Sequence, residues 1–289
     1  MKNDMKTKMK TYKRSPLSLF LRIILIAAAA LTLIILFFII IYILVRGIPN
    51  LRLSMFAWEY NSENVSMMPA IINTILMVLL ALAFAAPIGI FSAIYLTEYA
   101  KRGNKLVGVV RLTTETLSGI PSIVYGLFGF LMFVTALQWG YSFLAGAVTL
   151  AMMVLPTIMK TTEEALKAVP DSYRQGSYGL GAGTLRTVFQ VVLPPAIPGI
   201  LSGIILSIGR IVGETAALIF TAGTVAQIPS GLLHQSGRTL AVHMYALLNE
   251  GLYVDEAYAT AVILLVVVIV INAVSEKLAT KLAKKTGGS

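Results

Sequence analysis

The sequence predicts an all-α integral membrane protein with about six transmembrane helices. Hydrophobic residues make up 57% of the 289 residues, charged residues only 12%, and the mean hydropathy is +0.83. A soluble domain carries roughly 25% charged residues, about twice this share. Apolar runs of about 20 residues, enough to cross a bilayer as a helix, recur along the whole chain. These runs are continuously apolar and do not alternate with polar residues, which argues against a closed β-barrel.

The first predicted span, residues 23–45, follows a basic N-terminal segment. Its apolar core is too long for a secretory signal and no small-residue cleavage site follows, so we expect the span to be retained. The other predicted spans are residues 71–96, 121–137, 143–159, 196–222 and 257–274. Together they predict one transmembrane permease domain over 18–285, with a basic cytoplasmic tail at 1–17 and a short tail at 286–289.

The net charge of +10 is distributed in a way that predicts topology and not nucleic-acid binding. Basic residues cluster before the first span, between the second and third, in the 160–192 loop and after the last span. The opposite segments carry only Arg46, Arg52 and Arg238. Because cytoplasmic segments of membrane proteins are enriched in Lys and Arg, we expect both termini and the 160–192 loop to be cytoplasmic.

The residues that the chain lacks exclude several classes of chemistry. Without cysteine there is no disulfide framework and no thiolate site. The chain has no GxxxxGK[ST] phosphate loop, so we expect ATP hydrolysis to occur on a separate chain. His234 and His243 have no acidic or cysteine companions at ligand spacing, so neither a metal site nor a cofactor is predicted. No histidine lies in a predicted span, which disfavours an intramembrane hydrolase, and an ion-coupled carrier would normally show internal repeats.

A polar loop over residues 160–192 separates two apolar spans and is predicted to fold as a helical unit. Ser172 and Gln175 stand at capping-box spacing, which predicts a helix over residues 173–180. Gly181 can adopt the left-handed conformation that ends such a helix. A rigid helix on a loop between spans can transmit the movement of another protein to the membrane helices.

This loop resembles the cytoplasmic EAA loop of ABC-importer permeases. Gln175, Gly176 and Ser177 occupy the Glu-Ala-Ala places, Gly181 occupies the glycine place, and Leu193-Pro194 ends the pattern. The acidic residue of the pattern is absent here. The resemblance implies coupling to an ATPase through the loop, and the residues assigned to coupling are Tyr173, Arg174, Gln175, Gly176, Ser177, Tyr178 and Gly181.

The predicted fifth span carries small and polar residues at helical spacing. On one continuous helix, five of them fall within an arc of roughly 80°, and these candidate translocation residues are Gly203, Ser207, Arg210, Glu214 and Thr221. Arg210 and Glu214 are one turn apart and can neutralise each other. Two readings follow. The pair is a buried structural ion pair, or the face lines a translocation path and Arg210 meets an anion.

A second Arg-x-x-x-Glu arrangement, Arg111 and Glu115, precedes Pro121 near the predicted cytoplasmic boundary. Proline interrupts the helical hydrogen bonding at that point. We interpret Arg111 and Glu115 as a structural or gating pair.

Four blocks of the sequence resemble the PstA family. They are YLTEYA at 95–100, GIPSIVYGLFG at 119–129, GRIVGETAA at 209–217 and LAVHMYALLNEG at 240–251. The resemblance implies the type-1 ABC importer permease (MetI-like) fold and a permease subunit of a phosphate importer in the bacterial plasma membrane. It implies a PstC-like permease, a PstB-like ATPase dimer and a PstS-like phosphate-binding protein as partners, with inorganic phosphate as the transported ligand. The alternative substrate is another oxyanion, namely molybdate, sulfate or phosphonate.

Overall fold

The computed structural model describes residues 16–101, 103–230 and 235–285, and these residues form helices joined by turns, without strands. The predicted tail at 286–289, most of the basic tail at 1–17, and His234 lie outside the described residues. The helical segments in chain order are α2 (Pro16–Gly47), η1 (Ile48–Asn50), η2 (Leu53–Phe56), α3 (Met68–Ile94), η3 (Tyr95–Tyr99), α4 (Lys105–Ser118), α5 (Ser122–Gly129), η4 (Phe130–Ala136), α6 (Phe143–Ala168), α7 (Asp171–Gly179), α8 (Thr184–Thr187), η5 (Val188–Val192), α9 (Leu193–Val212), α10 (Ala216–Thr221), α11 (Leu240–Glu250) and α12 (Val254–Lys285).

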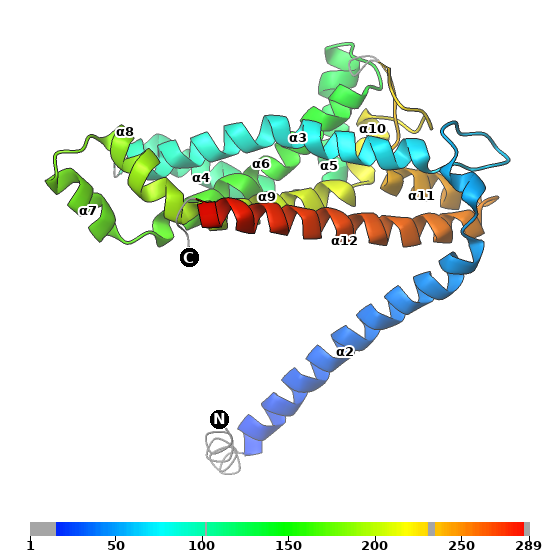
Figure 1. Cartoon of the computed structure of the whole chain (residues 1–289), viewed down its shortest axis with the longest axis horizontal. Coiled ribbons are helices and arrows are strands. Elements are labelled where there is room, and N and C mark those ends of the chain that lie inside the picture. Colours follow the sequence, from blue (N-terminus) through cyan, green and yellow to red (C-terminus); the bar gives the residue numbers. More distant parts are fainter. Residues whose placement is uncertain (1–15, 102, 231–234, 286–289) are drawn as a thin grey trace.

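Helices α3, α9 and α12 run along one another and give the body its long axis (Figure 1). Helices α7 and α8 lie at one end of this axis, which we call the α7 end. Helix α11 and the start of α12 lie at the other end, which we call the α11 end. Helix α2 joins the body only at the α11 end and diverges from it along the rest of its length (Figure 1).

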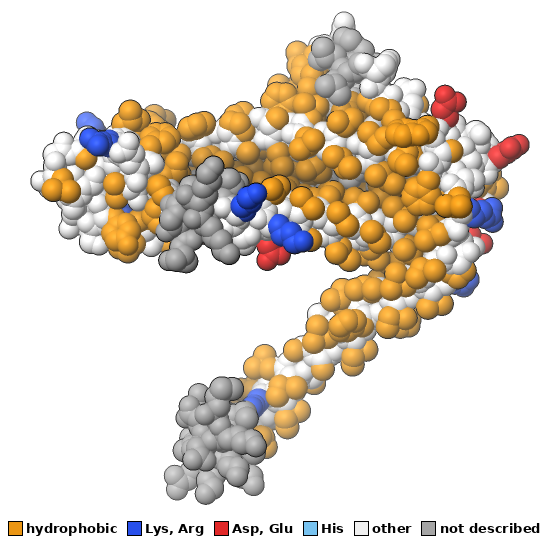
Figure 2. Space-filling model, in the orientation of Figure 1, with side chains coloured by type: hydrophobic (Ala, Val, Ile, Leu, Met, Phe, Trp, Pro, Cys, Tyr) orange, Lys and Arg blue, Asp and Glu red, His pale blue; other side chains and the backbone are white. Residues whose placement is uncertain are grey.

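The core of the body forms around α6, which packs against α3, α9 and α10. Its most apolar window is 67% buried, the highest share among the candidate spans. The large side chains that fill this core are fully buried and include Met77, Leu150, Met153, Ile158, Ile211 and Leu218. In contrast, the most apolar window of α2 is not buried at all within the chain. Figure 2 shows hydrophobic side chains along the whole of α2 and over most of the visible face of the body.

The prediction of about six spans is confirmed. Five helices are long and apolar enough to cross a membrane, and a sixth candidate is a bent pair formed by Lys105–Ser118 and Ser122–Ala136. The predicted span 121–137 matches the stretch Ser122–Ala136, which is a candidate span only together with Lys105–Ser118, to which it is bent by 106°. The bend occurs at Gly119–Pro121, where proline supplies no backbone N–H to continue the helix.

The predicted continuous fifth span, 196–222, is wrong in its second half. Helix α9 ends at Val212 and α10 begins at Ala216. Gly213 caps α9, and glycine costs about 1 kcal/mol relative to alanine inside a helix. The carboxylate of Glu214 accepts a hydrogen bond from the Ala217 N–H at 3.1 Å, and this bond satisfies a donor at the start of α10. The local sequence thus ends one helix and starts another.

Close helix packing predicts that Gly203→Ala destabilises the fold. A Cβ at Gly203 would lie 2.7 Å from the Cβ of Thr161 on α6 and would overlap its hydroxyl oxygen. Overpacking of this kind costs about 1–3 kcal/mol. We expect a lower melting temperature for Gly203→Ala in detergent. Gly209→Ala on the same helix is the matched control, because a Cβ there meets nothing within 4 Å. Equal melting temperatures for the two variants would contradict this account of the α6–α9 contact.

Candidate functional site

A groove of about 850 Å³ lies between α6, α9 and α12 and contains Arg210. Arg210 stands in the last turn of α9. We call this the Arg210 groove, and its lining residues are Thr157, Ser202, Ile205, Leu206, Gly209, Arg210, Asn272 and Glu276. Hydroxyl, amide and guanidinium groups therefore share one concave surface in an otherwise apolar helix bundle.

Of the five predicted translocation residues, only Arg210 lines this groove. Gly203 faces Thr161 of α6, and the fully buried Ser207 donates its hydroxyl to the carbonyl of Gly203. Thr221 is also fully buried, and its hydroxyl donates to Ala217 within α10. The predicted common face is thus divided: the small residues of α9 serve close packing against α6, while the neighbouring face, with Ser202, Leu206 and Gly209, borders the groove.

The expected neutralisation of Arg210 by Glu214 is wrong. The helix break at Gly213 removes the one-turn spacing on which it depended, and the Glu214 carboxylate bonds to the N-terminus of α10 instead. None of the ion pairs found in the described part of the chain includes Arg210. A guanidinium without a carboxylate partner offers forked N–H donors that suit a planar or tetrahedral oxyanion.

Sequence reasoning missed the contribution of α12 to this groove. Asn272 and Glu276 come from the last span and line the groove with Arg210. Asn272 lies inside the predicted last span, and Glu276 follows it by one helical turn, just beyond the end of that span. A polar residue such as Asn272 in an apolar span is a signal for a functional site.

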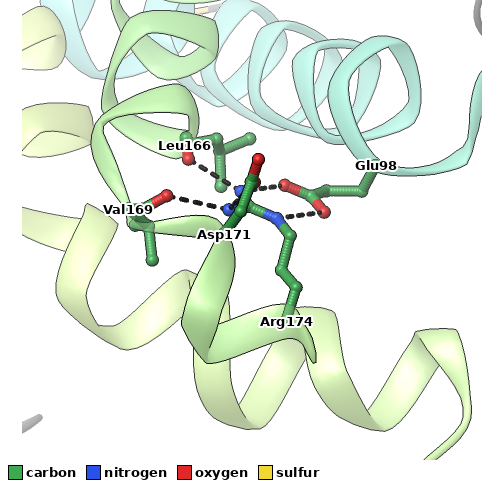
Figure 3. A network of polar contacts seen from close by, with 5 residues as sticks. All are labelled: Glu98, Leu166, Val169, Asp171 and Arg174. Atoms are coloured by element: carbon green, nitrogen blue, oxygen red, sulfur yellow. Dashed lines mark hydrogen bonds and ion pairs between the residues drawn. The ribbon is translucent and has the colours of Figure 1, made fainter. Parts of the chain in front are cut away.

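At the α7 end, Arg174 fastens α7 to the body (Figure 3). Its Nε and Nη2 donate to the two carboxylate oxygens of Glu98 in η3, at 3.1 and 2.6 Å. The same guanidinium donates to the carbonyls of Val169 and Leu166 beyond and within the end of α6, at 2.8 and 2.9 Å. The hydrogen bonds to Glu98 raise the pKa of Arg174 above the usual arginine value. The side chain of Arg174 therefore points toward the body of the protein. The sequence predicts Arg174 as a coupling residue from its place in the 160–192 loop and does not predict these contacts.

The other predicted coupling residues divide into two groups. Tyr173, Gly176, Ser177 and Gly181 line a hollow of about 590 Å³ between α7 and the α8–η5 segment, whereas Gln175 and Tyr178 do not. Ser177 and Thr187 form a hydroxyl hydrogen bond of 2.9 Å that joins α7 to α8. Tyr173 and Tyr178 are about half exposed and project from the α7 unit as aromatic groups.

The predicted helix in the loop is confirmed as α7, and its predicted end at Gly181 is confirmed by a φ of +81°. The predicted capping box is wrong. Pro170 occupies the N-cap position and Ser172 lies inside the first turn, so no side chain caps this helix. Proline before the helix fixes the start through its restricted φ, which displaces the start by two residues from the predicted position.

Arg111 pairs with Glu163 of α6 and not with Glu115. The distance from Arg111 Nη2 to Glu163 Oε1 is 2.6 Å, and Lys167 Nζ reaches the same oxygen at 2.6 Å. Glu115 lines a small hollow of about 160 Å³ beside this cluster. Because Glu163 lies on a different helix, the cluster ties α4 to α6, a contact that spacing within one helix could not predict.

The α11 end contains a buried basic cluster that sequence reasoning did not identify. Arg238 is 4% exposed, and its guanidinium carbon lies 4.6 Å from the centre of the Tyr60 ring. His243 is fully buried and meets the same ring edge-on, with ring centres 6.1 Å apart. Neither His243 nitrogen has a hydrogen-bond partner. Within the described ranges, no three His, Cys, Asp or Glu side chains come together as metal ligands.

Burial and the charge of Arg238 lower the pKa of His243 to about 3, which makes stability depend on pH. The folded chain therefore binds fewer protons than the unfolded chain once the pH falls below the ordinary histidine value. This contribution to stability is fully present at pH values well above 6.5 and is lost as the pH falls toward 3, by about 1.4 kcal/mol per pH unit.

We expect the melting temperature of the wild type to fall more steeply than that of His243→Phe between pH 7 and pH 4.5. Phenylalanine keeps an aromatic ring against Tyr60 but has no titrating nitrogen. The difference between the two curves isolates this ring from the carboxylates that also titrate in the range. Parallel curves would show that His243 is not the group responsible.

Comparison with known proteins assigns the family. Residues 85–287 match the family described as "Binding-protein-dependent transport system inner membrane component". The "Probable ABC transporter permease protein YqgI" of Bacillus subtilis is 32% identical over 261 residues, covering 84% of this chain and 88% of that protein. The "Phosphate transport system permease protein PstA 1" of Mycobacterium tuberculosis is 35% identical over 205 residues, covering 70% of this chain and 67% of that protein.

A solved structure supports the same fold. The crystal structure of a bacterial ABC transporter involved in the import of the acidic polysaccharide alginate contains a chain that superposes with a TM-score of 0.66, at 16% identity, covering 95% of this chain and 99% of that one. The predicted type-1 ABC importer permease (MetI-like) fold is thereby confirmed. The chain is a multi-pass protein of the bacterial inner membrane, and it belongs to the family of binding-protein-dependent transport system inner membrane components, as a relative of the PstA permeases.

Proposed function

We propose that this chain is the transmembrane permease subunit of an ATP-driven phosphate importer. The observation that carries the proposal is Arg210, a cation without a carboxylate partner among the described residues, on the wall of an 850 Å³ groove in a membrane domain. The relationship to proteins named as phosphate transport permeases supports phosphate as the oxyanion. The groove supplies one wall of a path, and a homologous permease supplies the other.

The chemistry of the Arg210 groove suits transient binding of an oxyanion. The Arg210 guanidinium can donate two hydrogen bonds to phosphate oxygens, while Ser202 and Asn272 offer further neutral donors. Glu276 shares the groove, and its negative charge weakens the hold on a dianion. This balance favours passage over tight retention, as a transport path requires.

The proposed orientation places the α7 end and both termini in the cytoplasm. Basic residues are frequent at the α7 end, as the positive-inside rule requires of a cytoplasmic face. They are Lys101, Lys105, Arg111, Lys160, Lys167, Arg174, Arg186, Lys277 and Lys281. The proposed organisation is a cytoplasmic tail at 1–17, a single permease domain over 18–285 with its coupling loop at about 160–192, and a C-terminal tail at 286–289.

The proposed partners are a PstC-like permease, a PstB-like ATPase dimer and a PstS-like phosphate-binding protein, and ATP is hydrolysed on the ATPase chains. The exposed Tyr173 and Tyr178 dock the α7 unit onto the ATPase dimer. Closure of that dimer pushes α7, and the Arg174–Glu98 pair transmits the push to the end of α3. The Arg111–Glu163 pair, beside Glu115, joins α4 to α6 and moves with them as a structural or gating contact.

The test is uptake of phosphate-32 by proteoliposomes that contain this chain with its partner permease and ATPase. ATP-dependent uptake that requires the phosphate-binding protein, and that excess sulfate or molybdate does not reduce, is the expected result. Uptake that molybdate, sulfate or phosphonate abolishes would move the assignment to another oxyanion. Uptake without ATP or binding protein would contradict an ABC importer altogether.

A further inference from the structure

A second hollow, remote from the Arg210 groove, opens at the α11 end. Its wall combines aromatic rings, a carboxylate and an amide. We call it the Trp58 hollow; its volume is about 460 Å³ and its lining residues are Trp58, Glu59, Tyr60, Pro69, Ala226, Gln227 and Ile228. Trp58 is 70% exposed, so its ring is accessible at the surface of the hollow.

Aromatic faces next to a carboxylate form the surroundings that a guanidinium or ammonium group prefers, because the ring quadrupole and the negative charge both attract a cation. Gln227 adds an amide that can accept a hydrogen bond from such a group. The lining therefore fits a basic side chain.

The loop that presents Trp58 and Glu59 is held in one conformation. The side chain of Asn61 accepts hydrogen bonds from the backbone N–H groups of Glu63 and Asn64, at 3.0 and 2.7 Å. The side chain of Asn64 in turn donates to the carbonyl of Glu59 at 2.9 Å. Val65 has a φ of +45°, which a β-branched residue adopts only where its surroundings enforce it, and it is 2% exposed. A hollow built on such a loop is formed before any partner arrives.

The ring of Tyr60 is also held by packing. It contacts the buried guanidinium of Arg238 and, edge-on, the ring of His243. Arg238 itself does not line the hollow. Glu59 is exposed, so it provides the negative charge at the surface of the hollow.

The α11 end carries more acidic than exposed basic side chains. Its carboxylates are Glu59, Glu63, Glu250, Asp255 and Glu256, whereas its exposed basic residues are Arg46 and Arg52, of which Arg52 lies 3.9 Å from Glu256. Acidic side chains are visible at this end of the molecule in Figure 2. Such a surface repels a free phosphate dianion and attracts a protein whose docking face is basic. Phosphate would thus reach the path from a docked carrier and not directly from solution.

We propose that the Trp58 hollow receives a lysine or arginine side chain of the extracytoplasmic binding protein. The proposal rests on the proposed function, because it assumes that the α11 end faces the compartment of that protein. The incoming cation lies against Trp58 and pairs with Glu59, and the surrounding carboxylates steer the approach.

The experiment titrates phosphate-loaded binding protein against the ATPase activity of the assembled complex in lipid nanodiscs. We expect Glu59→Lys to raise the half-saturating concentration about tenfold, equivalent to about 1.4 kcal/mol, with the rate at saturation unchanged. Glu63→Lys is the matched control, since it makes the same charge change on the same loop outside the hollow, and its effect should stay within about twofold. Trp58→Ala should also weaken docking without changing the saturated rate.

Several results would overturn the assignment, and three of them come from the titration. They are an unchanged half-saturating concentration in Glu59→Lys, equal shifts in the two lysine variants, and tighter docking in Glu59→Lys, which would indicate an acidic occupant. Loss of the partner permease from purified Glu59→Lys complexes would instead identify the hollow as a contact between permeases and would also overturn it. If the wild-type complex does not respond to phosphate-loaded binding protein at all, the proposed function itself fails.

Discussion

Glu98→Ala is expected to abolish coupled uptake, because it leaves the guanidinium of Arg174 without its carboxylate. The side chains of Glu98 and Arg174 are 4% and 15% exposed, so the pair is largely removed from water. Removing one member of a buried pair costs about 3–5 kcal/mol. Since Arg174 also binds the carbonyls of Leu166 and Val169, the loss should loosen α7 from both α3 and α6.

The measurement is phosphate uptake and ATP hydrolysis by the same reconstituted complex. We expect uptake to fall at least tenfold in Glu98→Ala, with hydrolysis no longer responsive to the binding protein. Asp171→Asn is the matched control, because Asp171 also contacts Arg174, at 3.3 Å, but its side chain is 74% exposed. A surface contact of this kind contributes at most about 1 kcal/mol. Normal uptake in Glu98→Ala would show that the pair does not transmit the motion.

Arg210→Ala is expected to lose transport, whereas Arg210→Lys should retain part of it. Alanine removes the guanidinium from the groove and leaves no fixed cation on its wall among the lining residues. Each hydrogen bond to a charged group is worth about 1.5–3 kcal/mol, which corresponds to a loss of roughly 10- to 100-fold. Lysine restores the charge but not the two-pronged geometry.

The control for shape is Leu206→Ala, which removes an apolar side chain from the same groove while Arg210 stays in place. Its uptake should stay near the wild-type level, and basal ATP hydrolysis should persist in all three variants. Wild-type uptake in Arg210→Ala would contradict a role for this cation in the path. Equal losses in Leu206→Ala and Arg210→Ala would assign the effect to the shape of the groove.

The fold could be predicted from the sequence to the extent that it depends on continuous apolar length. Spans near 23–45 and 257–274 lie within α2 and α12, and the span near 71–96 falls in α3 and the start of η3. Helix α7 was predictable because its end depends on one residue, Gly181, whose left-handed conformation is a local property. The break between α9 and α10 was missed, because the apolar run continues across Gly213 and hides the change in backbone direction.

The candidate site was predictable only in part. Arg210 stood out as a charge in an apolar span, and it does line the groove. Its assumed partner was wrong, because neutralisation by Glu214 required one unbroken helix. The sequence does not predict that Glu98 pairs with Arg174, because the two residues are 76 positions apart. No pattern in the residues next to either one indicates such a pair.

The sequence by itself determined the membrane location, the approximate number of spans and the presence of a helix in the 160–192 loop. Each of these depends on hydrophobicity, charge or turn chemistry within a short window. Only the tertiary structure decided that Arg174 pairs with Glu98, that Arg111 pairs with Glu163, and that α12 joins α6 and α9 around Arg210. The physical reason is that insertion of a span into the bilayer depends on the length of one continuous apolar segment. The hydrogen-bond partner of a polar side chain in a helix bundle depends instead on which group the packing of the helices brings near it.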